Sequence, residues 1–199
     1  MTVPIEEIAG CRAAHERLHA ALDALAPEHQ QQASLLPGWS VGQVLAHLVG
    51  NGESVLRRLE GATAGRQEPM YVGGPDARAA FIDEFGAAPL PEIVDRLRSV
   101  DDRIDSLFAE LDPDVWDAAV LARGDVPVLA EELPFHRWRE VEVHLTDLGR
   151  GATPADWSAA LVERMLPGLI GDLRARTDPN ALAGWLTGRS PAPELGAWL

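Results

Sequence analysis

Glu140 and His144 are the two side chains whose types and spacing best suit metal chemistry. They are four residues apart, so on a helix they project from the same face, about one turn apart. Catalytic zinc sites usually take three nitrogen or oxygen ligands from the protein and keep one position open. His47 is the leading candidate for the third ligand, because it lies beside the apolar residues Val44 and Leu48, which a neighbouring helix would face. On spacing alone, however, such a Glu and His pair is more often an exposed ion pair than a metal site.

Two other reactive groups compete with this set. His15 and His19 are also four residues apart, but their stretch is polar and rich in alanine, which favours a solvent-facing helix surface. Cys11 is the only cysteine; apart from Arg12 it has no basic neighbour to activate it, so we expect a small buried thiol. The sequence contains no G-x-S-x-G, no glycine-rich phosphate loop and no C-x-x-C. Serine-hydrolase and nucleotide chemistry therefore lack support.

The overall charge and composition narrow the choice of partners. The formal net charge of the 199 residues is −14, so the field of the protein repels nucleic acids and anionic membrane surfaces. All 17 basic residues are arginines, which excludes lysine Schiff-base chemistry and leaves arginine to bind anions. The acidic N-terminus lacks the features of a signal peptide, and no apolar run approaches the roughly 18 to 20 residues of a membrane span. We expect a soluble cytoplasmic protein.

Hydrophobic periodicity predicts the helices that must position these groups. Ser40 is a good N-cap for the helix that carries His47. Around Val141 and Val143 apolar and acidic residues alternate, so a strand competes with a helix there. Long helices are predicted at 4–26, 41–61, 91–111, 131–148 and 155–176, short ones at 76–86 and 180–188, and loops at 61–75 and 112–131. The loop at 61–75 is long and rich in glycine and proline, as functional loops often are. This pattern indicates a mainly all-α bundle.

Three runs of the sequence also have a recognisable order and spacing. They are LPGWSVGQVLAHL (36–48), PMYVGG (69–74) followed by Arg78, and LPFHRWREVEVHLTDLG (133–149). Together they resemble the mycothiol-dependent maleylpyruvate isomerase family, a branch of the DinB-like metal-binding four-helix bundles. The resemblance covers about residues 5–150, with a weaker match in the tail at LAGWLTGR (182–189).

The resemblance implies a DinB-like four-helix bundle over residues 1–151. Residues 152–199 would form a short, truncated C-terminal extension, since family isomerases generally carry a longer C-terminal α/β domain there. The resemblance also implies that His47, Glu140 and His144 bind zinc or another divalent metal. The low-molecular-weight thiol mycothiol would then bind as a thiolate at the open metal position.

The resemblance further implies a reaction and the residues that assist it. The thiolate adds to the activated double bond of maleylpyruvate, the resulting single bond rotates, and expulsion of the thiolate gives the trans isomer, fumarylpyruvate. Arg78 and Arg189 occupy positions that resemble the functional arginines of the family, and arginine matches the carboxylates of a diacid. Asn51, one turn after His47, and Arg78 are expected to contact the cofactor.

Two other functions fit the same residues. A mycothiol S-transferase of this fold would join the thiol to another electrophile and release a stable thioether. A metal- or thiol-binding bundle without turnover is the non-enzymatic alternative. In each case the expected partners are a small thiol and a small anionic or electrophilic molecule, with the protein a monomer or a homodimer.

Overall fold

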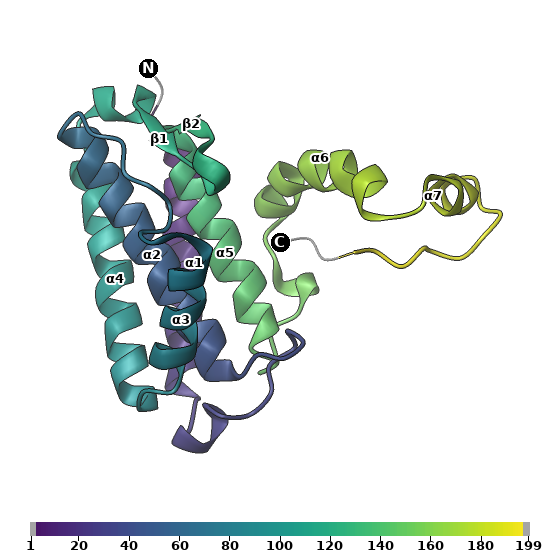
Figure 1. Cartoon of the computed structure of the whole chain (residues 1–199), viewed down its shortest axis with the longest axis horizontal. Helices are drawn as coiled ribbons and strands as arrows, with labels where there is room; N and C mark the ends of the chain where they lie inside the picture. Colours follow the sequence, from purple (N-terminus) through teal and green to yellow (C-terminus); the bar gives the residue numbers. More distant parts are fainter. Residues whose placement is uncertain (1–2, 197–199) are drawn as a thin grey trace. The chain divides into compact units, whose positions relative to one another are not determined.

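The computed structural model describes residues 3–196, and most of them are helical (Figure 1). The helices and strands follow the chain in the order α1 (Ile5–Asp23), α2 (Val41–Thr63), α3 (Gly74–Gly86), α4 (Leu90–Glu110), β1 (Ala119–Leu121), β2 (Pro127–Leu129), α5 (Leu133–Asp147), α6 (Ala159–Arg176) and α7 (Pro179–Leu186). The chain forms two compact units, one ending at Asp156 and the other beginning at Trp157.

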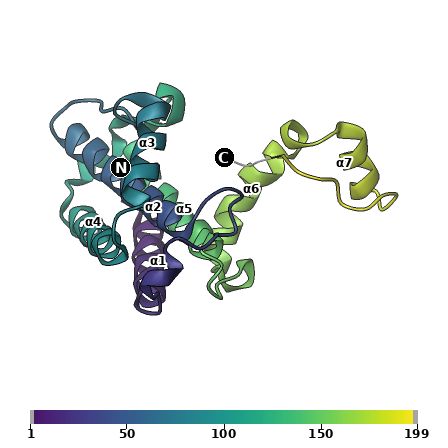
Figure 2. The same ribbon diagram turned by 60° about the horizontal axis from the view of Figure 1, so that its bottom comes forward.

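The first unit is a four-helix bundle made of α1, α2, α4 and α5 (Figures 1 and 2). Helix α1 packs on α5 and α4, α2 packs on α4 and α5, and α3 lies outside this ring against α2. The apolar faces predicted from the periodicity meet in the core, whose fully buried members include Leu18, Leu45, Leu48, Leu59, Ile93, Leu97, Ile104, Leu133 and Val141. The predicted all-α bundle is therefore confirmed.

Helix α2 begins at the predicted N-cap. The hydroxyl of Ser40 accepts a hydrogen bond from the backbone N–H of Gln43 at 3.2 Å, and the side-chain carbonyl of Gln43 accepts one from the backbone N–H of Ser40 at 2.8 Å. This reciprocal capping box satisfies two backbone donors that the first turn of a helix leaves free. It sets the start of the helix that carries His47 two turns later.

Two glycines allow α3 to approach α2 closely. A Cβ atom on Gly42 would lie 2.3 Å from the backbone oxygen of Gly86, and a Cβ on Gly86 would lie 2.9 Å from the Cα of Gln43. Both distances are too short for a side chain, so the contact is between backbones. Further along, a Cβ on Gly50 would meet the ring of Phe81 at 3.1 Å.

The structure differs from the sequence prediction between the bundle helices. The sequence predicts a loop over 112–131. This prediction is wrong, because β1 and β2 form an antiparallel hairpin with Val120 opposite Val128. Each strand has only three residues, and Pro127 within the second one weakens a strand pattern. The competing strand around Val141 and Val143 does not form, since both residues lie in α5.

The second unit consists of α6, α7 and the segment after them. Helix α6 continues through Pro167, as predicted, and the hydroxyl of Ser158 caps its start. The side chain of Asp178 accepts hydrogen bonds from two backbone N–H groups in the first turn of α7. Within residues 3–196, no helix is long and apolar enough to cross a membrane.

Candidate metal centre

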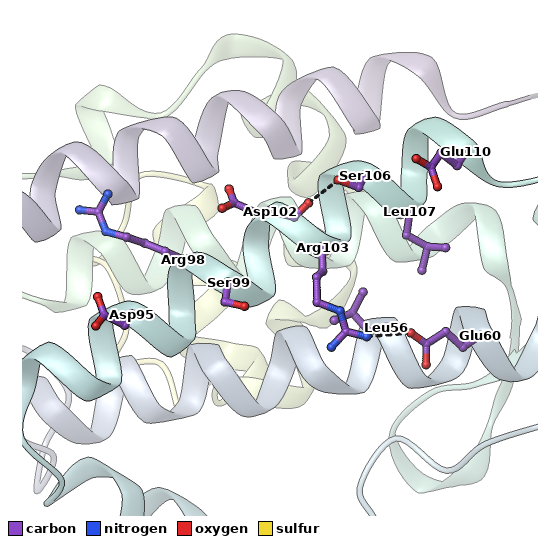
Figure 3. Close-up of a pocket in the computed structure, with 10 residues that line it drawn as sticks. All are labelled: Leu56, Glu60, Asp95, Arg98, Ser99, Asp102, Arg103, Ser106, Leu107 and Glu110. Atoms are coloured by element: carbon purple, nitrogen blue, oxygen red, sulfur yellow. Dashed lines mark hydrogen bonds and ion pairs between the residues drawn. The ribbon is translucent and has the colours of Figure 1, made fainter.

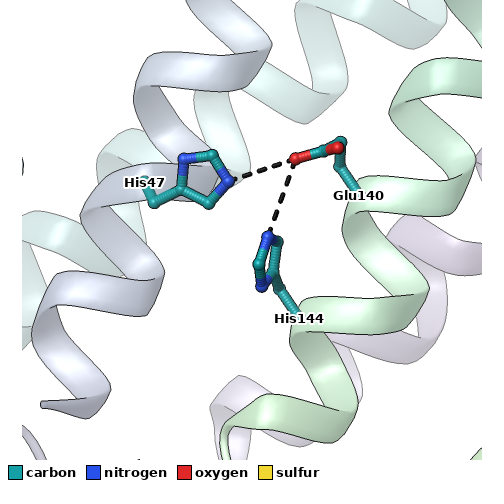
Figure 4. A group of neighbouring side chains, drawn as sticks. All are labelled: His47, Glu140 and His144. Carbon is teal, nitrogen blue, oxygen red and sulfur yellow. Dashed lines mark hydrogen bonds and ion pairs between the residues drawn. The ribbon is translucent and has the colours of Figure 1, made fainter. Parts of the chain in front are cut away.

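His47, Glu140 and His144 come together where α2 faces α5 (Figure 4). Nε2 of His47 lies 3.1 Å from Oε2 of Glu140, and Nε2 of His144 lies 3.6 Å from the same oxygen. The ring centroids of the two histidines are 4.6 Å apart, and the rings are nearly perpendicular. One ligand atom from each residue lies within 4.8 Å of the others. The three residues predicted from the sequence thus converge on one point.

Burial and hydrogen bonding set the charges in this cluster. Burial lowers the pKa of His47 from 6.5 to about 4, although Glu140 opposes the shift. Burial disfavours the ionised carboxyl of Glu140, but hydrogen bonds from the two histidines outweigh it and hold its pKa well below the usual value. At neutral pH, Glu140 is therefore a carboxylate and His47 is a neutral imidazole, the forms that bind metals.

Asp147 fixes the orientation of the second histidine. Its Oδ2 lies 2.8 Å from Nδ1 of His144, one turn away on α5. Burial disfavours the charge on His144, but the hydrogen bonds to Asp147 and Glu140 outweigh it and raise its pKa. A carboxylate on one ring nitrogen commonly leaves the other free for a metal. Two imidazole nitrogens and one carboxylate oxygen, with this support behind them, fit the donor set of a three-ligand zinc site.

Arg78 reaches the cluster from α3. Its Nη2 lies 3.1 Å from Nδ1 of His47, so the guanidinium contacts the ring on the side away from Glu140. The same guanidinium lies over the rings of Tyr71, at 5.3 Å, and Trp39, at 6.0 Å. Cation–π contacts of this kind hold a cation in place while its remaining N–H groups stay free for a ligand.

A pocket of about 230 Å³ lies beside His47. Its walls come from α2, α3 and the loop between them. This loop lies within the segment 61–75 that the sequence predicts to be a functional loop. The lining residues are His47, Gly50, Asn51, Glu53, Arg57, Met70, Tyr71, Val72, Ala77, Arg78, Phe81 and Ile82. Three predicted residues, His47, Asn51 and Arg78, therefore share one pocket.

A larger hollow of about 620 Å³ lies elsewhere, along α2 and α4 (Figure 3). It contains none of the predicted site residues. Its lining includes the surface ion pair of Arg103 and Glu60, which are 3.0 Å apart and both more than half exposed. Convergent buried polar groups mark functional sites better than size does, so we place the site at the smaller pocket.

The other predicted residues are distributed as follows. Asn51 is 4% exposed, and its side-chain oxygen accepts a hydrogen bond from Arg137 at 2.9 Å. Arg189 belongs to the second unit, is exposed, and donates to the backbone oxygen of Thr187. Its predicted role in binding substrate stays a prediction.

The prediction for the two N-terminal histidines is wrong for His15. Its side chain is 1% exposed and contacts Asp105 at 3.0 Å and Asp101 at 3.2 Å, because α1 turns this face toward α4. His19 is partly exposed and also contacts Asp101, at 3.0 Å. The prediction for Cys11 is confirmed: the thiol is fully buried, and burial raises its pKa well above the ordinary value.

Sequence reasoning missed Arg137, a fully buried arginine that forms an ion pair with the fully buried Asp101 at 2.6 Å. A signal was present, because Arg137 lies four residues after Leu133 and four before Val141, in the core register of its helix. Asp101 occupies an equivalent register on α4. Two opposite charges in the core registers of two helices indicate a buried pair.

The fold and the site together define a helix bundle with a two-histidine, one-glutamate cluster. The sequence profile of the mycothiol maleylpyruvate isomerase N-terminal domain matches residues 11–149. The chain therefore belongs to this family. A search of curated proteins found none that matches the chain.

Solved structures show the same relationship. A crystal structure of the mycothiol-dependent maleylpyruvate isomerase is 26% identical, with a TM-score of 0.78 over 83% of this chain and 70% of that chain. A histidine-to-alanine mutant of that enzyme matches with the same TM-score and coverage at 25% identity. YfiT from Bacillus subtilis, described as a probable metal-dependent hydrolase with an unusual four-helix bundle topology, is 18% identical. Its TM-score is 0.58 over 78% of this chain and 89% of its own, so it supports the DinB-like fold alone.

Proposed function

We propose that this chain is a zinc- and mycothiol-dependent cis–trans isomerase of maleylpyruvate or a similar unsaturated diacid. The observation that carries the proposal is the convergence of His47, Glu140 and His144 beside a pocket that Arg78 lines. Membership of the maleylpyruvate isomerase family supports the same reaction.

The three-residue cluster would hold the metal through Nε2 of His47, a carboxylate oxygen of Glu140 and Nε2 of His144. When bound, the metal lowers the pKa of a thiol such as mycothiol, which supplies a thiolate for reversible addition to an activated double bond. The cycle needs no oxidant or reductant. Asp147 would keep His144 in the required tautomer through its bond to Nδ1.

Arg78 would bind a carboxylate of the substrate next to the reacting double bond. Its guanidinium can make two parallel hydrogen bonds to a carboxylate. The stacking on Tyr71 and Trp39 limits the freedom of Arg78, so less conformational entropy is lost when a ligand binds. Asn51 would contribute a neutral hydrogen-bonding group to the same pocket.

An assay with zinc-loaded protein, mycothiol and maleylpyruvate tests the proposal. We expect loss of maleylpyruvate absorbance only when the thiol is present, with fumarylpyruvate identified by proton NMR. The double variant His47→Ala, His144→Ala should lose the activity, whereas His29→Ala, in the turn after α1, should keep it.

The same assay separates the alternatives. A stable thioether product would contradict isomerisation and identify an S-transferase. Binding of zinc and thiol with no turnover of maleylpyruvate or other electrophiles would identify a non-catalytic binding protein. Wild-type activity in the double histidine variant would contradict both enzymatic functions.

A further inference from the structure

Arg137 lies at the centre of the bundle, on α5, with no exposed surface. Burying a guanidinium without partners is very costly, so each of its N–H groups needs an acceptor. One Nη2 bond reaches Asp101, which balances the charge, and Nε lies 3.3 Å from Nε2 of His15. Arg137 also donates two hydrogen bonds to α2.

On α2 the same guanidinium spans one turn of helix. Its Nη1 donates to the backbone oxygen of Leu48 at 2.8 Å and to Oδ1 of Asn51 at 2.9 Å. Gly52 leaves the space for this approach, because a Cβ there would lie 3.3 Å from the Cζ of Arg137. The guanidinium is therefore held at Asn51 by contacts with three helices.

This contact decides how the amide of Asn51 is oriented. A guanidinium only donates, so the atom that faces Arg137 is the amide oxygen, and Nδ2 lies on the other branch of the amide. Asn51 lines the pocket beside His47. In residues 3–196 no group accepts a hydrogen bond from Nδ2. Its N–H groups are therefore available to a ligand.

The charges around this part of the pocket favour an acceptor. Arg78 contributes a second set of N–H donors. Glu53 is the carboxylate among the lining residues, and it is paired with Arg96, whose Nε donates to it at 2.8 Å. Arg57 is engaged with the loop, since its Nη2 donates to the backbone oxygens of Pro69 and Met70.

We infer that Arg137 is a positioning residue, which holds the Asn51 amide with its N–H groups toward the pocket so that Asn51 and Arg78 together bind a carboxylate. The inference rests on the proposed function, in which the substrate is an unsaturated diacid, and it specifies where one carboxylate binds. Arg137 itself does not contact the ligand.

Binding of maleate, a small cis-diacid, to zinc-loaded protein tests the inference without thiol or turnover. Asn51→Asp keeps an oxygen that accepts from Arg137 but replaces the amide donor with a second acceptor. We expect maleate to bind about tenfold more weakly or worse, measured by titration calorimetry, because a hydrogen bond to a charged group is lost and a like charge added. Asn180→Asp, the same change in the second unit, should leave the dissociation constant unchanged.

A double-mutant cycle separates positioning from a purely structural role. Arg137→Lys keeps the charge beside Asp101 but cannot make all four contacts, so maleate affinity should fall several-fold. In an Asn51→Ala background the same substitution should cause no further loss, because the two residues act as one unit. A lower melting temperature with unchanged affinity would show a structural role alone and overturn the inference.

If Arg137→Lys does not fold, a crystal structure of the wild type with maleate decides the role of Arg137: Arg137 against one branch of the Asn51 amide and a maleate carboxylate against the other support the inference, and any other arrangement overturns it. Equal maleate affinity in the wild type and Asn51→Asp, or no binding of maleate to the wild type, overturns the inference. Failure of the proposed function looks different: maleate would bind in the predicted way, but maleylpyruvate would not be isomerised.

Discussion

Nη2 of Arg78 donates a hydrogen bond to Nδ1 of His47, and this contact determines which nitrogen of the ring carries the proton. An arginine N–H cannot accept, so Nδ1 must offer its lone pair. A neutral imidazole has one proton, which then lies on Nε2, facing Oε2 of Glu140 at 3.1 Å.

Metal binding should therefore separate Arg78 from His47. A metal at Nε2 needs the lone pair there, which moves the ring proton to Nδ1, opposite the donor of Arg78. Two donors repel, so we expect the guanidinium to turn away and become available to a carboxylate. Crystal structures of zinc-loaded and chelator-treated protein would measure this. A metal on Nε2 with Arg78 still within hydrogen-bond distance of Nδ1 would contradict the prediction.

Asp147 should be needed for tight metal binding although it is not a ligand. Asp147→Asn exchanges the acceptor at Nδ1 of His144 for an amide that can also present its N–H. We expect zinc affinity to fall about 10- to 100-fold, as is typical when such a supporting partner is lost. Competition with a chromophoric chelator measures the change. Asp95→Asn, on the exposed face of α4, is the matched control, and an equal loss there would point to a general charge effect.

Zinc affinity should decrease as the pH falls. The metal binds the deprotonated ligands, so a proton on His144 competes with it. The pKa of His144 is raised above its ordinary 6.5, whereas that of His47 is lowered to about 4. Competition near neutral pH therefore comes from His144, and zinc binding there should release a proton. Calorimetry in buffers of different ionisation enthalpy counts this proton, and an affinity that does not change from about pH 6 to pH 8 would refute the prediction.

Removing one member of the buried ion pair of Arg137 and Asp101 should destabilise the protein more than removing both. Arg137→Met leaves the Asp101 carboxylate buried and without its main counter-charge, which costs about 3–5 kcal/mol of unfolding free energy in comparable cases. Adding Asp101→Asn removes the stranded charge and should restore part of the loss. Urea denaturation measures both. Arg103→Met, at an exposed ion pair, should change stability by less than about 1 kcal/mol.

The helices could be predicted from the sequence because their apolar residues recur at spacings of three and four residues. Ser40, as an N-cap, also predicts where α2 begins. The hairpin could not, since three-residue strands are too short for alternation to be recognised. The burial of His15 could not be predicted either. Its own stretch of sequence is rich in alanine and indicates an exposed helix face, whereas the partners that bury it, Asp101 and Asp105, come from α4.

The candidate site could also be predicted only in part. Spacing identified Glu140 and His144 as a pair on one helix, but the addition of His47 depends on how α2 faces α5, which local sequence does not encode. The resemblance to a family made up for this. Arg137 was missed because each of its contacts lies at least 36 residues away along the chain.

The backbone contact between Gly42 and Gly86 has an evolutionary consequence. Helix α3 is held to the bundle by close glycine packing at one end, while the metal cluster is built on α2 and α5. Residues of α3 and its preceding loop can therefore vary while the three clustered residues, which lie on α2 and α5, stay unchanged. A protein engineer could follow the same route, randomising the pocket face of α3 and leaving the two glycines in place.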